Sequence, residues 1–134
     1  MTDMGTLRCY RPDPSRLGHS ETWRHASASA TVTPNSIVVA IAGDLDASNA
    51  HDLARYIELH SAATDDFYVD LRDVTFFSTA GLAVLRRVEH QYAQCGSRWR
   101  LLASPAVRKV LRVCGAQNLP QLETLDAARV PSLV

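Results

Sequence analysis

The chain has 134 residues, a length that suits one domain with a hydrophobic core of its own. Hydrophobic residues make up 46% of it and charged residues 21%, which is ordinary globular usage and excludes collagen-like, coiled-coil and wholly disordered proteins. The 14 basic residues balance 14 acidic ones, so the chain lacks the net positive charge that favours binding to nucleic acids or anionic membranes, and neither is an expected partner.

Residues 1–24 show no repeating apolar period, so we predict a flexible N-terminal arm there and one folded domain over residues 25–134. The domain begins with small apolar residues that alternate with Ser and Thr over 26–32, the two-residue period of a half-exposed strand. Turn residues at 33–36 and a continuous apolar run over 37–42 follow. Together these patterns predict a β-hairpin.

A helix and a parallel strand are predicted next. Asn49 can cap the first free amides of a helix that runs to about Ser61, and His60 near its end is expected to be a satisfied boundary residue rather than a metal ligand. Residues 67–71 have the apolar and aromatic character of a strand. Because a helix separates this strand from the run over 37–42, the two strands should be parallel, with a right-handed connection.

The rest of the chain continues the alternation of helix and strand. The predicted elements are a helix over 80–95, a strand over 99–103, a helix over 105–114, a short strand over 119–122 and a final helical turn over 124–129. Ser104 as cap, Pro105 at the first helical position and Gly115 just past the end mark the helix over 105–114. This alternation predicts an α/β domain.

The segment between residues 73 and 82 carries the functional signal. Two hydroxyl side chains, Ser78 and Thr79, lie where a strand passes into a helix, which is where open α/β sheets usually place their functional groups. The helix amino terminus offers unpaired N–H groups and a partial positive charge, so it can accommodate a phosphate on either hydroxyl. A purely structural role is open as well, since either side chain can cap the helix.

An apolar docking patch is predicted beside these hydroxyls, with Phe77, Ala80, Leu82 and Val84 as its members. Strand alternation sends neighbouring residues to opposite faces, and we predict that Phe76 points into the core while Phe77 lies nearer the surface. Burying such a patch against a partner favours association. A phosphate would add about 1.5 to 2 negative charges to it, so we expect phosphorylation to block binding.

Two acidic residues, Asp44 and Asp46, follow the second predicted strand. If that strand neighbours the strand over 67–71, both carboxylates lie at the same sheet edge as Ser78 and Thr79 and add to the repulsion of a phosphate. The alternative is a solvated turn whose charge favours the start of the next helix.

Three motifs occur in order along the chain, namely Gly43-Asp44-Leu45-Asp46, then Val69-Asp70-Leu71-Arg72-Asp73-Val74-Thr75-Phe76 leading to Thr79-Ala80-Gly81-Leu82, and Ser104-Pro105-Ala106-Val107 with Gly115. In these motifs the chain resembles the STAS domain of bacterial anti-sigma factor antagonists, over roughly residues 26–130. The resemblance implies a single STAS-type α/β domain with a mixed sheet of four to five strands and helices packed mainly on one face.

The resemblance also implies a regulator of transcription that is not an enzyme, of the kind used in bacterial stress responses. Members of the family bind an anti-sigma factor that is also a serine/threonine kinase, which frees a sigma factor; phosphorylation by that kinase ends the binding, and a phosphatase restores it. The family's acceptor lies two residues before a Gly, which corresponds to Thr79, with Ser78 as the second choice. Ser78 stands where the family has Asp, and Ala80 where it has a second hydroxyl residue. The expected partner-binding residues are Asp44, Asp46, Phe77, Ser78, Thr79, Ala80, Gly81, Leu82 and Val84.

Catalysis is not expected, because the five histidines accompany no nucleophile motif and the chain has no phosphate-binding glycine loop. No cofactor or metal is expected either, since the three cysteines are far apart and none belongs to a CxxC pair. Without a bilayer-spanning apolar run or a signal-peptide pattern, we expect a cytoplasmic protein, monomeric or weakly dimeric.

The sequence is also compatible with an alternative function, that of a STAS module that is not switched by phosphorylation. Such a module would scaffold partners, sense a small ligand or be gated by oxidation of Cys95 and Cys114. Each cysteine ends a predicted helix, and we expect the two helix ends to lie at the same pole of the domain, with both thiols buried.

Overall fold

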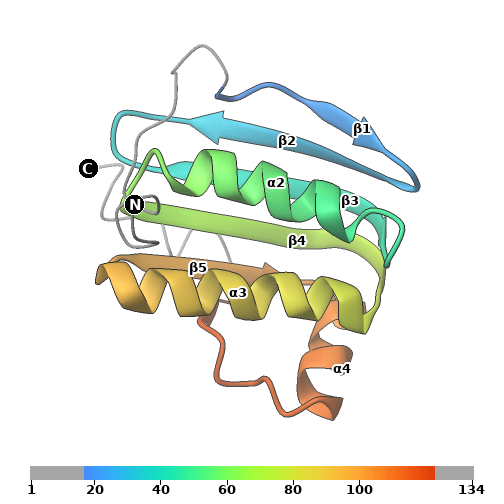
Figure 1. Cartoon of the computed structure of the whole chain (residues 1–134). Helices are drawn as coiled ribbons and strands as arrows, with labels where there is room; N and C mark the ends of the chain where they lie inside the picture. Colours follow the sequence, from blue (N-terminus) through green and yellow to red (C-terminus); the bar gives the residue numbers. More distant parts are fainter. Residues whose placement is uncertain (1–16, 123–134) are drawn as a thin grey trace, which may run out of the picture.

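The fold is organised around a mixed sheet in which six strands lie in chain order, β1 to β6 (Figure 1). The computed structural model describes residues 17–122. The strands are β1 (Glu21–Trp23), β2 (Ala26–Val32), β3 (Ile37–Leu45), β4 (Asp66–Phe77), β5 (Arg98–Ala103) and β6 (Gln121–Leu122), and the helices are α2 (Ala50–Ser61), α3 (Thr79–Cys95) and α4 (Pro105–Val113). The predicted single α/β domain with a mixed sheet is confirmed, and the sheet has six strands instead of the expected four to five.

The additional strand, β1, lies within the segment that was predicted to be a flexible arm. Its three residues, Glu21–Trp23, pair antiparallel with the start of β2, so the folded domain begins before residue 25. A strand of three residues is too short to show a period in the sequence. Residues 1–16, the rest of the predicted arm, and the helical turn predicted at 124–129 lie outside the described residues.

The predicted hairpin and parallel crossover are confirmed. β2 and β3 pair antiparallel from Ala26 opposite Gly43 to Val32 opposite Ile37, and β3 pairs parallel with β4 across the connection through α2. At Gly43 the backbone of β2 comes so close that a Cβ would lie 2.4 Å from the carbonyl oxygen of His25, and φ is +104°. Only glycine fits this crossing point without moving the hairpin.

Asn49 organises the connection from β3 to α2, although not by the capping bond that was predicted. Its side chain makes no cap hydrogen bond to α2. It is 0% exposed, its Nδ2 donates to the backbone oxygens of Arg24 and Asp44, and its Oδ1 accepts from the N–H of Asp46 at 3.1 Å. Asn49 therefore joins the end of the hairpin to the loop before α2.

All three described helices contribute to a core on one face of the sheet, as expected, and Figure 1 shows α2 and α3 side by side across it. The core combines Val39, Ile41, Phe67, Val69, Leu71 and Leu101 from the strands with Leu53, Tyr56 and Ile57 of α2, Leu85, Val88 and Tyr92 of α3, and Val107 and Leu111 of α4. On β2, Ala26 and Ala28 are buried in this core while Ser27 and Ser29 are exposed, which matches the two-residue period seen over 26–32.

A cluster of rings attaches the segment before β1 to α2. His60 is 0% exposed, which corrects its expected boundary position; its Nε2 accepts the Gly18 N–H at 3.0 Å. The ring proton is therefore assigned to Nδ1, which donates to the Tyr56 carbonyl oxygen at 2.9 Å. The Tyr56 hydroxyl donates to the backbone oxygen of His19. Burial lowers the pKa of His60, so the neutral ring is the form that this cluster holds.

Candidate functional site

Thr79 is the exposed first residue of α3, directly after the end of β4. The preceding residue, Ser78, caps the helix, since its Oγ accepts the N–H of Ala80 at 3.1 Å, and its own N–H donates to the Leu45 carbonyl oxygen at 2.9 Å. Within residues 17–122 the Thr79 hydroxyl makes no hydrogen bond. The structural role is thus carried by Ser78, and the Thr79 hydroxyl faces solvent.

The last part of β4 departs from simple alternation. Its register against β3 shifts twice, between Ala40 and Ala42 and between Gly43 and Asp44, and each shift places an extra residue in β4. Buried positions are consequently three residues apart, at Leu71, Val74 and Phe77. Such bulges change the face of the sheet toward which the following side chains point.

These bulges reverse the predicted orientation of the two aromatic residues. Phe76 is 52% exposed, whereas Phe77 is 4% exposed and belongs to the core cluster. The prediction that Phe76 points inward was wrong, because alternation counted from Val74 takes no account of the second bulge. Phe76 is therefore the aromatic side chain that β4 presents to solvent.

An apolar groove with a volume of about 440 Å³ runs between the end of β4 and helix α4. It is lined by Thr75, Phe76, Phe77, Ser78 and Thr79 on one side and by Ala106, Lys109, Val110, Val113 and Cys114 on the other. Val113, 74% exposed, and Phe76 are two of the three large hydrophobic residues exposed in the described chain. The groove thus gathers exposed apolar surface beside the Thr79 hydroxyl.

The docking patch that the sequence predicted differs from this groove. Leu82 and Val84 are buried in the core with Phe77, and Ala80 is half-buried. Gly81 is buried too, and a Cβ at this position would lie 2.6 Å from the Phe77 ring. This close packing holds the first turn of α3 against the end of β4. The residues of the expected patch are therefore largely structural, and α4 supplies exposed apolar surface instead. No motif near residue 79 predicts this contribution of α4.

Asp44 lies at the same sheet edge as the groove. It is opposite Phe76 in the register of β3 and β4, and its Oδ1 accepts the Thr75 hydroxyl at 2.7 Å. Asp46 lies further along the loop, where the hydroxyl and the N–H of Ser48 donate to it and hold the pKa of its carboxyl below the usual range. Neither carboxylate lines the groove itself.

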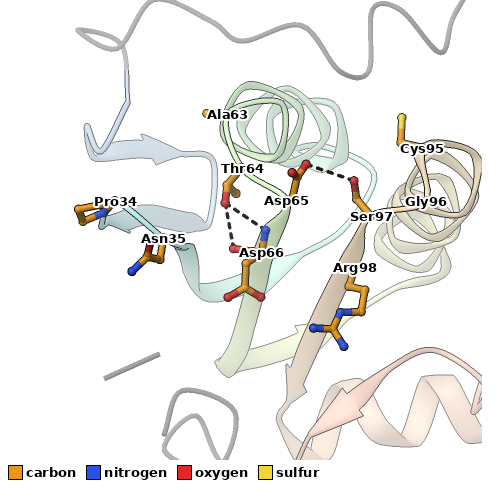
Figure 2. A pocket seen from close by; sticks show the side chains of 10 residues that line it. All are labelled: Pro34, Asn35, Ala63, Thr64, Asp65, Asp66, Cys95, Gly96, Ser97 and Arg98. Carbon is orange, nitrogen blue, oxygen red and sulfur yellow. Dashed lines mark hydrogen bonds between the residues drawn. The ribbon is translucent and has the colours of Figure 1, made fainter. Parts of the chain in front are cut away.

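A second, polar pocket of about 700 Å³ lies at the start of β4, where the side chains of Thr64, Asp65, Asp66 and Arg98 line it (Figure 2). Ser97 donates to Asp65 across it at 3.3 Å. The other lining residues are Pro34, Asn35, Ala63, Cys95 and Gly96. This pocket is separate from the groove, with which it shares no lining residue.

The two cysteines lie at opposite ends of β4, which overturns the prediction that they lie at the same pole of the domain. Cys95 lines the polar pocket and Cys114 the apolar groove, and the strand of 12 residues between the two sites spans roughly 35 Å. A disulfide needs Cα atoms within about 7 Å. The prediction failed because α4 has only 9 residues, about 13 Å of helix, and ends near the pole where it began. Cys114 is exposed and Cys95 half-buried, so neither is the buried thiol that was expected.

Two further observations bear on possible functions. Among residues 17–122, no group of three or more His, Cys, Asp and Glu side chains is placed to hold a metal ion. None of the helices in this part of the chain has the length and apolar character needed to cross a membrane.

Comparison with known protein families identifies the family of this chain. The family model of the STAS domain matches residues 27–128, and the chain therefore belongs to the STAS domain family. Among curated proteins, Osmosensory protein A of Mycobacterium tuberculosis is 34% identical over 70 residues, which cover 52% of this chain. The match spans 44% of the length of that relative.

Solved structures with the same fold include an anti-sigma factor antagonist from Mycobacterium paratuberculosis, with a TM-score of 0.70 and 21% identity over 81% of this chain and 95% of that one. For the anti-sigma factor antagonist SpoIIAA in its unphosphorylated form, the TM-score is 0.64 and the identity 18%, over 80% of this chain and 97% of that one. For the Bacillus cell fate determinant SpoIIAA in its phosphorylated form, the TM-score is 0.61 and the identity 17%, over 80% of this chain and 99% of that one. At these identities the likeness establishes the fold.

Proposed function

We propose that this chain is an anti-sigma factor antagonist, which binds a serine/threonine-kinase anti-sigma factor at the apolar groove and is released when Thr79 is phosphorylated. The observation that carries the proposal is the exposed Thr79 hydroxyl on the wall of an apolar groove at the start of α3. Membership of the STAS family and the shared fold of antagonist structures support the choice of partner.

Association would be driven by the apolar surface around the groove. Phe76 and Val113 expose 52% and 74% of their area, and covering such surface contributes about 25 cal/mol per Å² before the costs of association are subtracted. Asp44, which is opposite Phe76 in the register of β3 and β4, is a candidate for a polar contact at the rim. Asp46, on the loop between β3 and α2, is a second one.

Phosphorylation would transfer the γ-phosphoryl group of ATP to Thr79. The bond from Oγ1 to phosphorus forms, the bond to the β,γ-bridging oxygen breaks, ADP leaves with that electron pair, and the hydroxyl proton passes to a base of the kinase. The product carries about 1.5 to 2 negative charges at a surface that must lose water on binding, which opposes the complex. A phosphatase would restore binding by hydrolysing the ester, and the whole cycle would run in the cytoplasm.

The test mixes the full chain with each kinase-type anti-sigma factor of the source organism, with and without ATP, and follows affinity and intact mass. The wild type should bind without ATP, then gain one phosphate at Thr79 and dissociate when ATP is added. Thr79→Ala should bind under both conditions, because it removes the acceptor and leaves the groove intact. Thr79→Glu should weaken binding at least tenfold.

Thr31→Glu is the matched control, since Thr31 is exposed on β2 and does not line the groove. It should bind like the wild type. Equal affinity for the wild type, Thr79→Ala and Thr79→Glu would refute the switch, and transfer of the phosphate to Ser78 would move the acceptor to the helix cap.

A second candidate function, sensing of a small ligand, is favoured by the polar pocket, whose volume of about 700 Å³ is in the range of small-molecule sites. Native mass spectrometry of the chain purified from its source tests this candidate. A bound adduct that Arg98→Ala removes would support ligand sensing. An identical, unliganded mass for both proteins would argue against it.

A further inference from the structure

Lys109 is the one charged side chain among the residues described as lining the apolar groove. It is the only lysine in the chain, and it lies on α4, exposed, next to Arg108 and one turn before Arg112. Helix α4 contains no acidic residue. Lys109 also belongs to none of the ion pairs formed within residues 17–122.

We propose that Lys109 is the cation through which the groove switches partners: its ammonium pairs with a carboxylate of the anti-sigma factor while Thr79 is unmodified, and with the Thr79 phosphate afterwards. This inference rests on the proposed function and adds a specific contact to it. Lysine suits such a role, because its compact charge sits on a flexible four-carbon stem that can reach either anion.

The charge of the groove then reverses on modification. Unmodified, the lining residues carry a single positive charge, that of Lys109. A phosphate on Thr79 adds about 1.5 to 2 negative charges, which leaves the groove at about −0.5 to −1. A carboxylate that was attracted to the groove is now repelled by it, and Lys109 is occupied by the phosphate.

The same charges define the partner. A surface that is complementary to this groove presents apolar side chains toward Phe76 and Val113 and an Asp or Glu toward Lys109. Arg108, exposed beside Lys109 on α4, adds a second positive charge next to the groove. We therefore expect the docking segment of the anti-sigma factor to be acidic as well as apolar.

The first arm of the test measures affinity for the anti-sigma factor. Lys109→Met keeps the apolar stem and removes the charge, and it should weaken binding of the unmodified chain by about 3- to 10-fold. Lys109→Arg should restore most of the affinity. The matched control is Arg112→Met, which removes an exposed charge of α4 that does not line the groove and should change binding less than about twofold. Equal affinity for Lys109→Met and the wild type would overturn the carboxylate contact.

The second arm needs no partner. Full-length chain carrying phosphothreonine at position 79 is titrated by phosphorus NMR, with Lys109 present or replaced by Met. A nearby ammonium favours the doubly charged phosphate, so the phosphate pKa should be lower with Lys109 present, by about 0.3 to 0.7. Identical titration curves would overturn the phosphate contact.

The two arms separate failure of this inference from failure of the proposed function. If the unmodified chain binds no kinase-type anti-sigma factor, the proposed function fails and the carboxylate contact fails with it, while the phosphorus titration still decides the phosphate contact. If the wild type binds and Lys109→Met changes neither measurement, the inference alone fails. Circular dichroism and melting of each variant exclude misfolding as the cause.

Discussion

Replacing Phe76 by alanine should weaken binding to the anti-sigma factor without unfolding the chain. A phenylalanine buries about 150 to 250 Å² when fully enclosed, and Phe76 is 52% exposed, so about 100 Å² remains for a partner to cover. At roughly 25 cal/mol per Å² this area is worth about 2.5 kcal/mol, or about 70-fold in Kd. Losses on association reduce this value, and we expect a decrease between about 10- and 70-fold.

The adjacent aromatic residue should behave in the opposite way. Phe77 is 4% exposed, so Phe77→Ala should lower the free energy of unfolding by about 3 to 5 kcal/mol, whereas Phe76→Ala should lower it by less than about 1 kcal/mol. Urea unfolding measures the stabilities, and calorimetry measures the affinities of the variants that remain folded.

Val32→Ala is the control, because Val32 is 43% exposed on β2 and is not part of the groove. It should leave binding unchanged. Full affinity of Phe76→Ala would show that the partner does not cover the groove, and a large loss of stability in the same variant would show that the assigned orientation of the two rings is wrong.

Three further predictions concern the supports of the site. Gly81→Ala places a Cβ 2.6 Å from the Phe77 ring, so it should destabilise the chain by about 1 to 3 kcal/mol and reduce partner affinity by pushing that ring toward the groove; an unchanged unfolding midpoint would contradict this packing. Asn49→Ala leaves two carbonyl oxygens and one N–H without their buried partner, so it should lower the free energy of unfolding, measured in urea, by at least about 2 kcal/mol. A decrease below about 0.5 kcal/mol would rule out the bridging role of Asn49. The pKa of His60 is lowered by burial, so below about pH 6.5 the unfolded state binds more protons and stability should fall as the pH decreases. This slope should flatten in His60→Gln but not in the exposed control His51→Gln, and equal slopes in all three proteins would exclude His60 as its source.

Much of the fold could be predicted from the sequence, because its elements have strong periods and clear end signals. The hairpin, the parallel crossover and the helix that begins with Ser104 and Pro105 were all recognisable. The parts that were not predicted depend on tertiary contacts. β1 has three residues and therefore shows no period, and the Asn49 side chain donates a hydrogen bond to the carbonyl oxygen of Arg24, which is distant in sequence.

The site was predicted less completely than the fold. The exposed Thr79 and its neighbour Ser78 could be located from a strand-to-helix boundary, which is a local signal. The exposed face of Phe76 depends on two bulges set by pairing with β3, and the second wall of the groove comes from α4, about 30 residues further along the chain. Neither feature follows from the residues around position 79.

The match between strand order and chain order has a consequence for how the protein is made. Because each strand pairs with the one synthesised just before it, no pairing waits for a distant segment, and the three-stranded antiparallel part, β1 to β3, is complete before α2 leaves the ribosome. The nascent polypeptide can then add β4, β5 and β6 successively to a growing template. The groove, which needs both β4 and α4, forms only after α4 has been synthesised, so a chain that ends before α4 would lack one wall of the docking surface.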